Sequence, residues 1–206
     1  MSTEVWSKAD LHIHSNHSDG IAKIPEIMEY VATATDLKVI AITDHNTIEG
    51  ALFAKELEEV YGVEVIVGEE VSSSEGHIIG LFLSEEIPAG LTPAETIGRI
   101  NDQGGIAIIP HPFSARGVFG PFGGSAFLAT VSELAFHAVE VYNSVPYLGW
   151  ANRMAARMFK VEESLVDLRD GFAVLQEERG AAETYGLSPV QADAILRLTL
   201  GQLVNL

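Results

Sequence analysis

The sequence has no cysteine among its 206 residues. This absence excludes disulfide bonds and thiolate metal sites, so any metal ion must be held by histidine, aspartate or glutamate, the ligands of hard and borderline cations. Basic residues are scarce as well, with 12 lysines and arginines against 29 acidic residues and a net charge of -17. Such an excess of negative charge disfavours sequence-independent attraction to nucleic acid phosphates.

Long hydrophobic runs are also missing. No apolar stretch approaches the roughly 20 residues that span a bilayer, and the opening residues MSTEVWSKAD contain neither the basic region nor the apolar core of an export signal. We therefore expect a cytoplasmic protein without a membrane partner. The hydrophobic content of 47% is enough for one domain with a sizeable core.

Ligand-type side chains are dense near the start of the chain, in the stretch ADLHIHSNHSDG at residues 9–20. On a β-strand, His12 and His14 point to the same face and can share one ion, whereas on a helix they would lie about 200° apart. Gly20 favours a turn that offers Asp19 back toward the strand end. On this fragment alone, the alternative is a polar strand exit with solvated histidines.

The rest of the chain alternates apolar runs with helical patterns. The runs at 37–46, 63–72 and 105–113 end in candidate ligands, the run at 77–83 begins with one, and the run at 138–143 carries Glu140 and ends in Asn143. Helices are expected at 24–35, 47–61 and 92–105, the last with a capping box of Thr92 and Glu95 around Pro93. This order predicts an α/β fold with a mostly parallel sheet. In a closed or nearly closed barrel, the strand ends would converge on one cavity.

Five stretches together resemble the PHP family, named for polymerase and histidinol phosphatase: DLHIHSNHSDG, AITDHNT, GEEVSSSEGHIIGLF, IIPHPF and VEVYNS. The resemblance covers roughly residues 8–159. It implies an incomplete or distorted (β/α)7-type barrel that holds two or three metal ions and hydrolyses phosphate esters. The metal ligands that it implies are His12, His14, Asp19, His45, Glu70, His77 and His111. Glu70, rather than Glu69, takes the family's position after Gly68 and would bridge two ions.

The chemistry of these residues fits the resemblance. Imidazoles and carboxylates suit Zn²⁺, Mn²⁺ or Fe²⁺, and two such ions can generate a hydroxide that attacks phosphorus at neutral pH. Asp44 is a candidate for orienting a ligand imidazole or a bound water, and the alternative is that it caps the helix near Thr47. Arg116 is a candidate phosphate clamp, and the alternative is a solvated loop arginine. We expect His17 at an exposed turn or rim and His137 in a structural role.

The resemblance stops after residue 159. The family expects a further strand that supplies a last aspartate and a last histidine, and no histidine follows His137. The pattern of residues 160–206 predicts a helical hairpin. This hairpin would form a second unit, which begins at Lys160. The segment YGLSPVQADAILRLTLGQL within it resembles part of the A subunit of DNA gyrase and topoisomerase IV, from which we infer neither strand passage nor DNA binding. These helices could pair two copies of the chain as a homodimer.

Two classes of function follow. The first is a metal-dependent phosphoesterase that acts on small phosphomonoesters or nucleotide-type phosphate esters, with activity reduced by the missing ligands. Its partner would be a small phosphorylated substrate, and nucleic acid is expected only as a short end. The alternative is a non-catalytic metal-binding or structural module whose helical tail mediates association.

Overall fold

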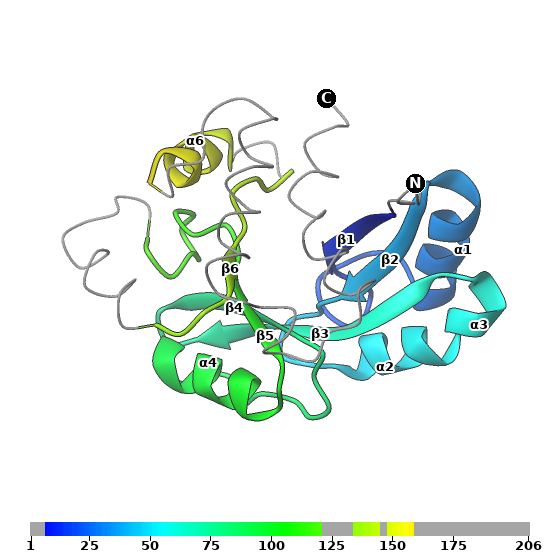
Figure 1. Cartoon of the computed structure of the whole chain (residues 1–206), viewed down its shortest axis with the longest axis horizontal. Helices are drawn as coiled ribbons and strands as arrows, with labels where there is room; N and C mark the ends of the chain where they lie inside the picture. Colours follow the sequence, from blue (N-terminus) through cyan, green and yellow to red (C-terminus); the bar gives the residue numbers. More distant parts are fainter. Residues whose placement is uncertain (1–6, 121–133, 145–147, 159–206) are drawn as a thin grey trace, which may run out of the picture.

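The structure is a computed structural model that describes residues 7–120, 134–144 and 148–158. Its strands form one curled sheet in the order β1-β2-β3-β4-β5-β6 (Figure 1). The strands are β1 (Lys8–Ile13), β2 (Leu37–Ile42), β3 (Glu64–Ser73), β4 (Gly76–Leu81), β5 (Ile106–Ile109) and β6 (Ala138–Val139). Within the described residues, β6 does not pair with β1. The sheet is therefore half of a barrel, which confirms the prediction of an incomplete α/β barrel.

One strand departs from the expected parallel arrangement. Strands β1, β2 and β3 are parallel, as are β5 and β6, but β4 runs antiparallel to both β3 and β5. The residues Ser73 and Gly76 pair with each other across the β3–β4 turn. Two intervening residues suffice for a hairpin, whereas a parallel connection needs a dozen or more.

The described helices are α1 (Ile24–Ala34), α2 (Glu49–Glu56), α3 (Glu58–Tyr61), α4 (Pro93–Asp102) and α6 (Gly149–Met158). Helices α1 to α4 lie along the outside of the sheet, and α6 stands apart beyond β6 (Figure 1). The three predicted helices are confirmed, and the segment 47–61 divides into α2 and α3 at Leu57. The capping box of Thr92 and Glu95 is present, with Pro93 in the first turn of α4. No helix of the described chain has the length and apolar character needed to cross a bilayer.

The inner strands β2, β4 and β5 are buried on both faces over most of their length. In β2, Val39 and Ala41 pack in the cluster that also contains residues of β1, β3, β4 and β5. Their neighbours Ile40 and Ile42 pack instead against α1 and α2. Because successive strand residues point to opposite faces, a strand covered on both sides has an unbroken apolar sequence. The predicted helical hairpin at 160–206, and with it the boundary at Lys160, lies outside the described residues.

Candidate metal centre

The candidate ligands meet at one edge of the curled sheet. His12 lies at the end of β1, His45 follows β2 and His111 follows β5. His77 begins β4, and because β4 is antiparallel its start lies at the same edge as the ends of the parallel strands. Together they border a cavity of about 520 Å³. The cavity is lined by His12, His14, Asp19, His45, Glu70, His77, His111, Ser114, Ala115, Arg116, Glu140, Asn143, Ser144 and Leu148.

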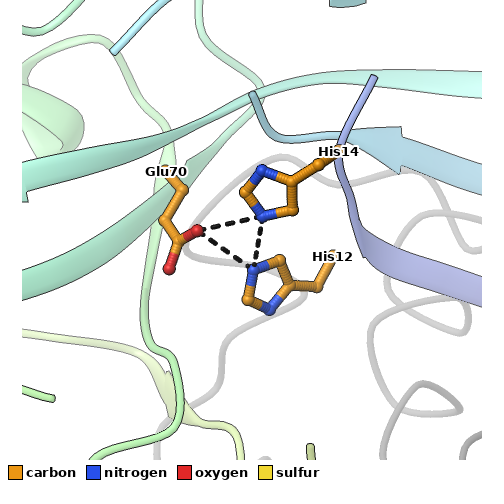
Figure 2. Close-up of side chains that lie close together, drawn as sticks. All are labelled: His12, His14 and Glu70. Carbon is orange, nitrogen blue, oxygen red and sulfur yellow. Dashed lines mark hydrogen bonds and ion pairs between the residues drawn. The ribbon is translucent and has the colours of Figure 1, made fainter. Parts of the chain in front are cut away.

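The carboxylate of Glu70 is the centre of this cluster, and the residue is almost fully buried. Its Oε2 atom faces three imidazoles: His12 Nε2 at 3.2 Å, His14 Nε2 at 3.0 Å and His45 Nδ1 at 3.4 Å. His12 Nε2 and His14 Nε2 are also only 3.1 Å apart (Figure 2). The predicted placement of the two histidines on one face is therefore confirmed.

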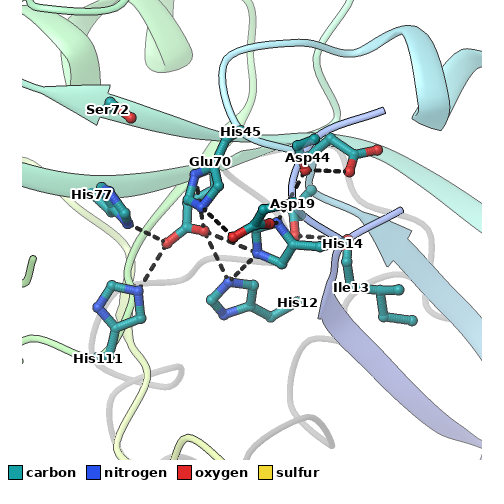
Figure 3. Close-up of polar contacts among 12 residues, drawn as sticks. His12, Ile13, His14, Asp19, Asp44, His45, Glu70, Ser72, His77 and His111 are labelled. Carbon is teal, nitrogen blue, oxygen red and sulfur yellow. Dashed lines mark hydrogen bonds and ion pairs between the residues drawn. The ribbon is translucent and has the colours of Figure 1, made fainter. Parts of the chain in front are cut away.

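The second oxygen of Glu70 faces a separate pair of imidazoles. Oε1 lies 2.9 Å from His77 Nδ1 and 2.9 Å from His111 Nε2 (Figure 3). The two carboxylate oxygens thus face different sets of histidines, on opposite sides of one carboxyl group. This is the arrangement that a bridging carboxylate between two ions requires.

Among the described residues, three overlapping groups could each hold a metal ion, because the ligand atoms within each group lie within 4.8 Å of one another. Two of them include Glu70, and the third is formed around Asp19. Asp19 Oδ1 is 3.1 Å from His14 Nδ1, and Oδ2 is 3.6 Å from His45 Nε2. The groups are His12–His14–Glu70, His14–Asp19–His45 and His45–Glu70–His77.

Asp44 lies to one side of the cluster (Figure 3) and does not line the cavity. Its carboxylate accepts hydrogen bonds from the backbone N–H and hydroxyl of Ser15 and from the hydroxyl of Ser18. These bonds fix the turn that carries Asp19. The capping alternative is wrong, because α2 has no side-chain cap and both oxygens of Asp44 are bonded to the turn. Its link to a histidine is indirect, through Ser18 Oγ at 3.4 Å from His14 Nδ1.

Two residues beside the cluster were not predicted as parts of the site. Glu140 Oε1 lies 3.0 Å from His12 Nδ1, and Ser114 Oγ lies 3.0 Å from His111 Nδ1. The signal for Glu140 was the same one that identified the histidines, since Glu140 directly follows β6. It was missed because the strand was expected to continue to Asn143, which would place Glu140 inside it.

Burial and neighbouring charges shift the pKa values of this cluster in opposite directions. Burial raises the pKa of the Glu70 carboxyl, but hydrogen bonds from the surrounding imidazoles outweigh it and hold that pKa far below its ordinary value. Burial likewise opposes protonation of His12, yet the carboxylates of Glu140 and Glu70 hold the pKa of His12 well above its ordinary value. Burial lowers the pKa of His45, which favours its neutral, ligating form.

The remaining candidates lie around the site. Arg116 is exposed and lines the cavity, and its role as a phosphate clamp stays a prediction. His17 does not line the cavity and lies 3.9 Å from Glu49 at the surface, as expected. His137 has the expected structural role: its Nδ1 atom accepts a hydrogen bond from the Ala107 backbone at 3.0 Å.

The family model for the PHP domain matches residues 10–140, which include every candidate ligand. The chain belongs to the PHP family. It is 45% identical over 159 residues to the uncharacterized protein MJ1587 of Methanocaldococcus jannaschii, a match that covers 72% of this chain and 88% of that protein. The PHP match ends before the tail and gives no support to the resemblance of the tail to the gyrase A subunit.

Two further proteins match in part. The phosphoribosyl 1,2-cyclic phosphate 1,2-diphosphodiesterase of Eggerthella lenta is 38% identical over 86 residues, which are 39% of this chain and 32% of that enzyme. A solved two-domain protein of Bacteroides vulgatus, described as containing a predicted PHP-like metal-dependent phosphoesterase, shares the fold with a TM-score of 0.58 and 21% identity. That match covers 72% of this chain and 48% of the two-domain protein.

Proposed function

We propose that this PHP chain is a metal-dependent phosphoesterase that hydrolyses small phosphomonoesters or nucleotide-type phosphate esters. One observation carries the proposal: the buried carboxylate of Glu70 presents each of its oxygens to a different set of histidines within an open cavity. A relative named as a phosphodiesterase supports the reaction class.

The donor set fits divalent transition metals. Its atoms are imidazole nitrogens and carboxylate oxygens, which suit Zn²⁺, Mn²⁺ and Fe²⁺. His45 provides a specific test of the fit, because its Nδ1 atom is buried and makes no hydrogen bond, although it lies 3.4 Å from Glu70 Oε2. A buried polar atom without a partner is costly, and a bound ion would satisfy it. The ligands that we propose are His12, His14, Asp19, His45, Glu70, His77 and His111.

The chemistry divides between the ions and the chain. When bound, divalent ions would supply a water of lowered pKa and positive charge to balance the phosphoryl oxygens. Glu70 would hold two ions close together, and Asp19 would complete the outer group near the surface. Arg116 is the sole lysine or arginine among the described residues of the cavity wall. Its guanidinium would bind phosphoryl oxygens in a bidentate manner and orient the ester.

The cavity also limits the substrate. A volume of about 520 Å³ with one guanidinium at its wall suits a small ester with a single anchored phosphate. The net charge of -17 disfavours long nucleic acids, although a short end could enter. The absence of the family's last aspartate and histidine should reduce turnover, since a misplacement of about 1 Å can lower a rate about 10²-fold.

The test is hydrolysis of p-nitrophenyl phosphate, nucleoside monophosphates and bis(p-nitrophenyl) phosphate by protein loaded with Mn²⁺ or Zn²⁺. We expect metal-stimulated turnover that falls about 10²-fold or more in Glu70→Gln, because the amide cannot bridge two cations. Glu69→Gln is the matched control: it makes the same change one residue away, and Glu69 is not part of the cavity wall.

Turnover that is unchanged by Glu70→Gln would identify a contaminant and remove the proposed activity. If the chain binds metal but hydrolyses none of these esters, the alternative of a non-catalytic metal-binding module stands instead.

A further inference from the structure

Three nitrogen atoms lie within hydrogen-bond distance of the Glu140 carboxylate. Its Oε1 atom lies 3.0 Å from His12 Nδ1, and its Oε2 atom accepts from the backbone N–H of His111 at 2.8 Å and from Asn143 Nδ2 at 3.0 Å. An ionised carboxylate can only accept hydrogen bonds. His12 Nδ1 must therefore be the donor, and the proton of a neutral His12 imidazole must reside on Nδ1.

This contact determines what the other nitrogen of His12 can do. With the proton on Nδ1, the lone pair of a neutral imidazole is on Nε2. Nε2 is the atom that lies beside Glu70 Oε2 and His14 Nε2, in one of the groups able to hold an ion. The Glu140 contact thus selects the tautomer that can bind a metal.

The same carboxylate holds a strained part of the opposite wall. His111 has a φ of 28°, a left-handed value that is strained for a residue other than glycine. Its backbone N–H is bonded to Glu140, and its Nε2 atom lies 2.9 Å from Glu70. The hydrogen bond that the His111 backbone donates to Glu140 therefore helps to keep His111 in the conformation that points its ring at the cluster.

Glu140 also connects two ends of the sheet. It follows β6, whereas His12 belongs to β1, and the two residues are 128 positions apart. Strands β1 and β6 are the opposite edges of the sheet and do not pair within the described residues. The hydrogen bond from His12 to Glu140 thus joins the edges at the site, where the described strands do not pair.

We infer that Glu140 is a positioning residue of the metal centre, which fixes the tautomer of His12 and the orientation of His111 across the open side of the half-barrel. The inference rests on the metal centre of the proposed function, but it does not depend on which ester is hydrolysed.

The sharpest test is Glu140→Gln, which keeps the shape of the side chain. Glutamine has one acceptor oxygen, and two donors, His111 N–H and Asn143 Nδ2, converge on the Oε2 position. The amide oxygen should occupy that position, so the NH₂ group faces His12 Nδ1 and can donate only to an unprotonated nitrogen. The proton of His12 then moves to Nε2, and the metal loses that ligand.

We expect Glu140→Gln to bind Zn²⁺ about 10- to 100-fold more weakly than the wild type in competition with a chromophoric chelator. Glu29→Gln, the same change at an exposed residue of α1, should bind as the wild type does. In zinc-loaded wild-type protein with ¹⁵N-labelled histidine, the His12 proton should be found on Nδ1. If Glu140 only supported the local packing, it would not determine which nitrogen of His12 carries the proton.

Unchanged zinc affinity in a folded Glu140→Gln variant would overturn the inference, and so would a proton on Nε2 of His12 in the zinc-loaded wild type. The second measurement decides the question even if the variant does not fold. Loss of zinc affinity in the variant together with no ester hydrolysis by the wild type would contradict the proposed function and leave the role of Glu140 intact.

Discussion

At the scale of the residue, two adjacent glutamates of β3 show how environment determines role. Glu69 and Glu70 point to opposite faces of the sheet because strand side chains alternate. Glu70 meets five imidazoles, whereas Glu69 is fully buried, and its Oε1 atom has no hydrogen-bond partner. Burial raises the pKa of the Glu69 carboxyl to about 7, against an ordinary value of 4.5.

The raised pKa predicts how Glu69 affects stability. A carboxyl group with a raised pKa in the folded state stabilises the fold below its unfolded pKa, and this contribution is lost as the pH rises from 4.5 toward about 7. Glu69→Gln removes this titration. The free energy of unfolding of the variant, measured relative to that of the wild type, should therefore rise by roughly 2–3 kcal/mol from pH 5 to pH 8. Urea unfolding at both pH values measures the difference, and parallel stability profiles would contradict the prediction.

Sequence reasoning located the candidate ligands well and their supporting residues poorly. All seven predicted ligands line one cavity, since strand ends and the antiparallel start of β4 share an edge. Glu140 was missed because its strand was expected to continue to Asn143, and Ser114 because residue type alone does not show that its hydroxyl contacts the ring of His111 three positions earlier. Residue type and strand position indicate a ligand, but a hydrogen bond over 128 positions leaves no local pattern.

At the scale of the element, the turn between β1 and α1 is built to present Asp19. Gly20 lies so close to the His14 carbonyl that any Cβ would clash with it, and Asp44 holds the turn through Ser15 and Ser18. The buried carboxylate of Asp44 thus supports the turn that carries Asp19, although it does not line the cavity. The sequence indicated the turn, because Gly20 and Asp19 are turn residues, but not the residue that fixes it.

Removal of the Asp44 carboxylate should therefore loosen one group of ligands. In Asp44→Ala the turn loses three hydrogen bonds, so Asp19 should no longer be held beside His14 and His45. We expect the most weakly held ion to be lost, with about a tenfold or greater decrease in its affinity, measured by metal content after dialysis. Asp102→Ala, at an exposed position of α4, is the control. Equal metal content in both variants would show that the turn does not depend on Asp44.

At the scale of the whole molecule, the half-barrel was predictable from the alternation of apolar runs and helical patterns. The reversed direction of β4 was not included in that prediction, although the two residues between β3 and β4 are too few for a parallel crossover. Among the described strands, β1 and β6 are the edges of the sheet, and the polar cluster at their ends takes part in joining them. Metal binding should therefore contribute to the stability of the fold as well as to its chemistry.

The stabilisation of the fold by metal should change with pH. Without metal, the raised pKa of His12 stabilises the folded protein fully below its unfolded value of 6.5, and this contribution is lost as the pH rises through the folded pKa. A metal ion competes with the proton of His12. Metal affinity should therefore rise over the pH range in which the metal-free protein loses stability. A metal at 100 times its Kd adds about 2.7 kcal/mol, which corresponds to a Tm increase of roughly 5–10 °C for a domain of this size. The Tm difference between zinc-loaded and chelator-treated protein should thus widen from pH 6 to pH 8. A difference that is constant or narrows with pH would show that His12 does not exchange its proton for the metal.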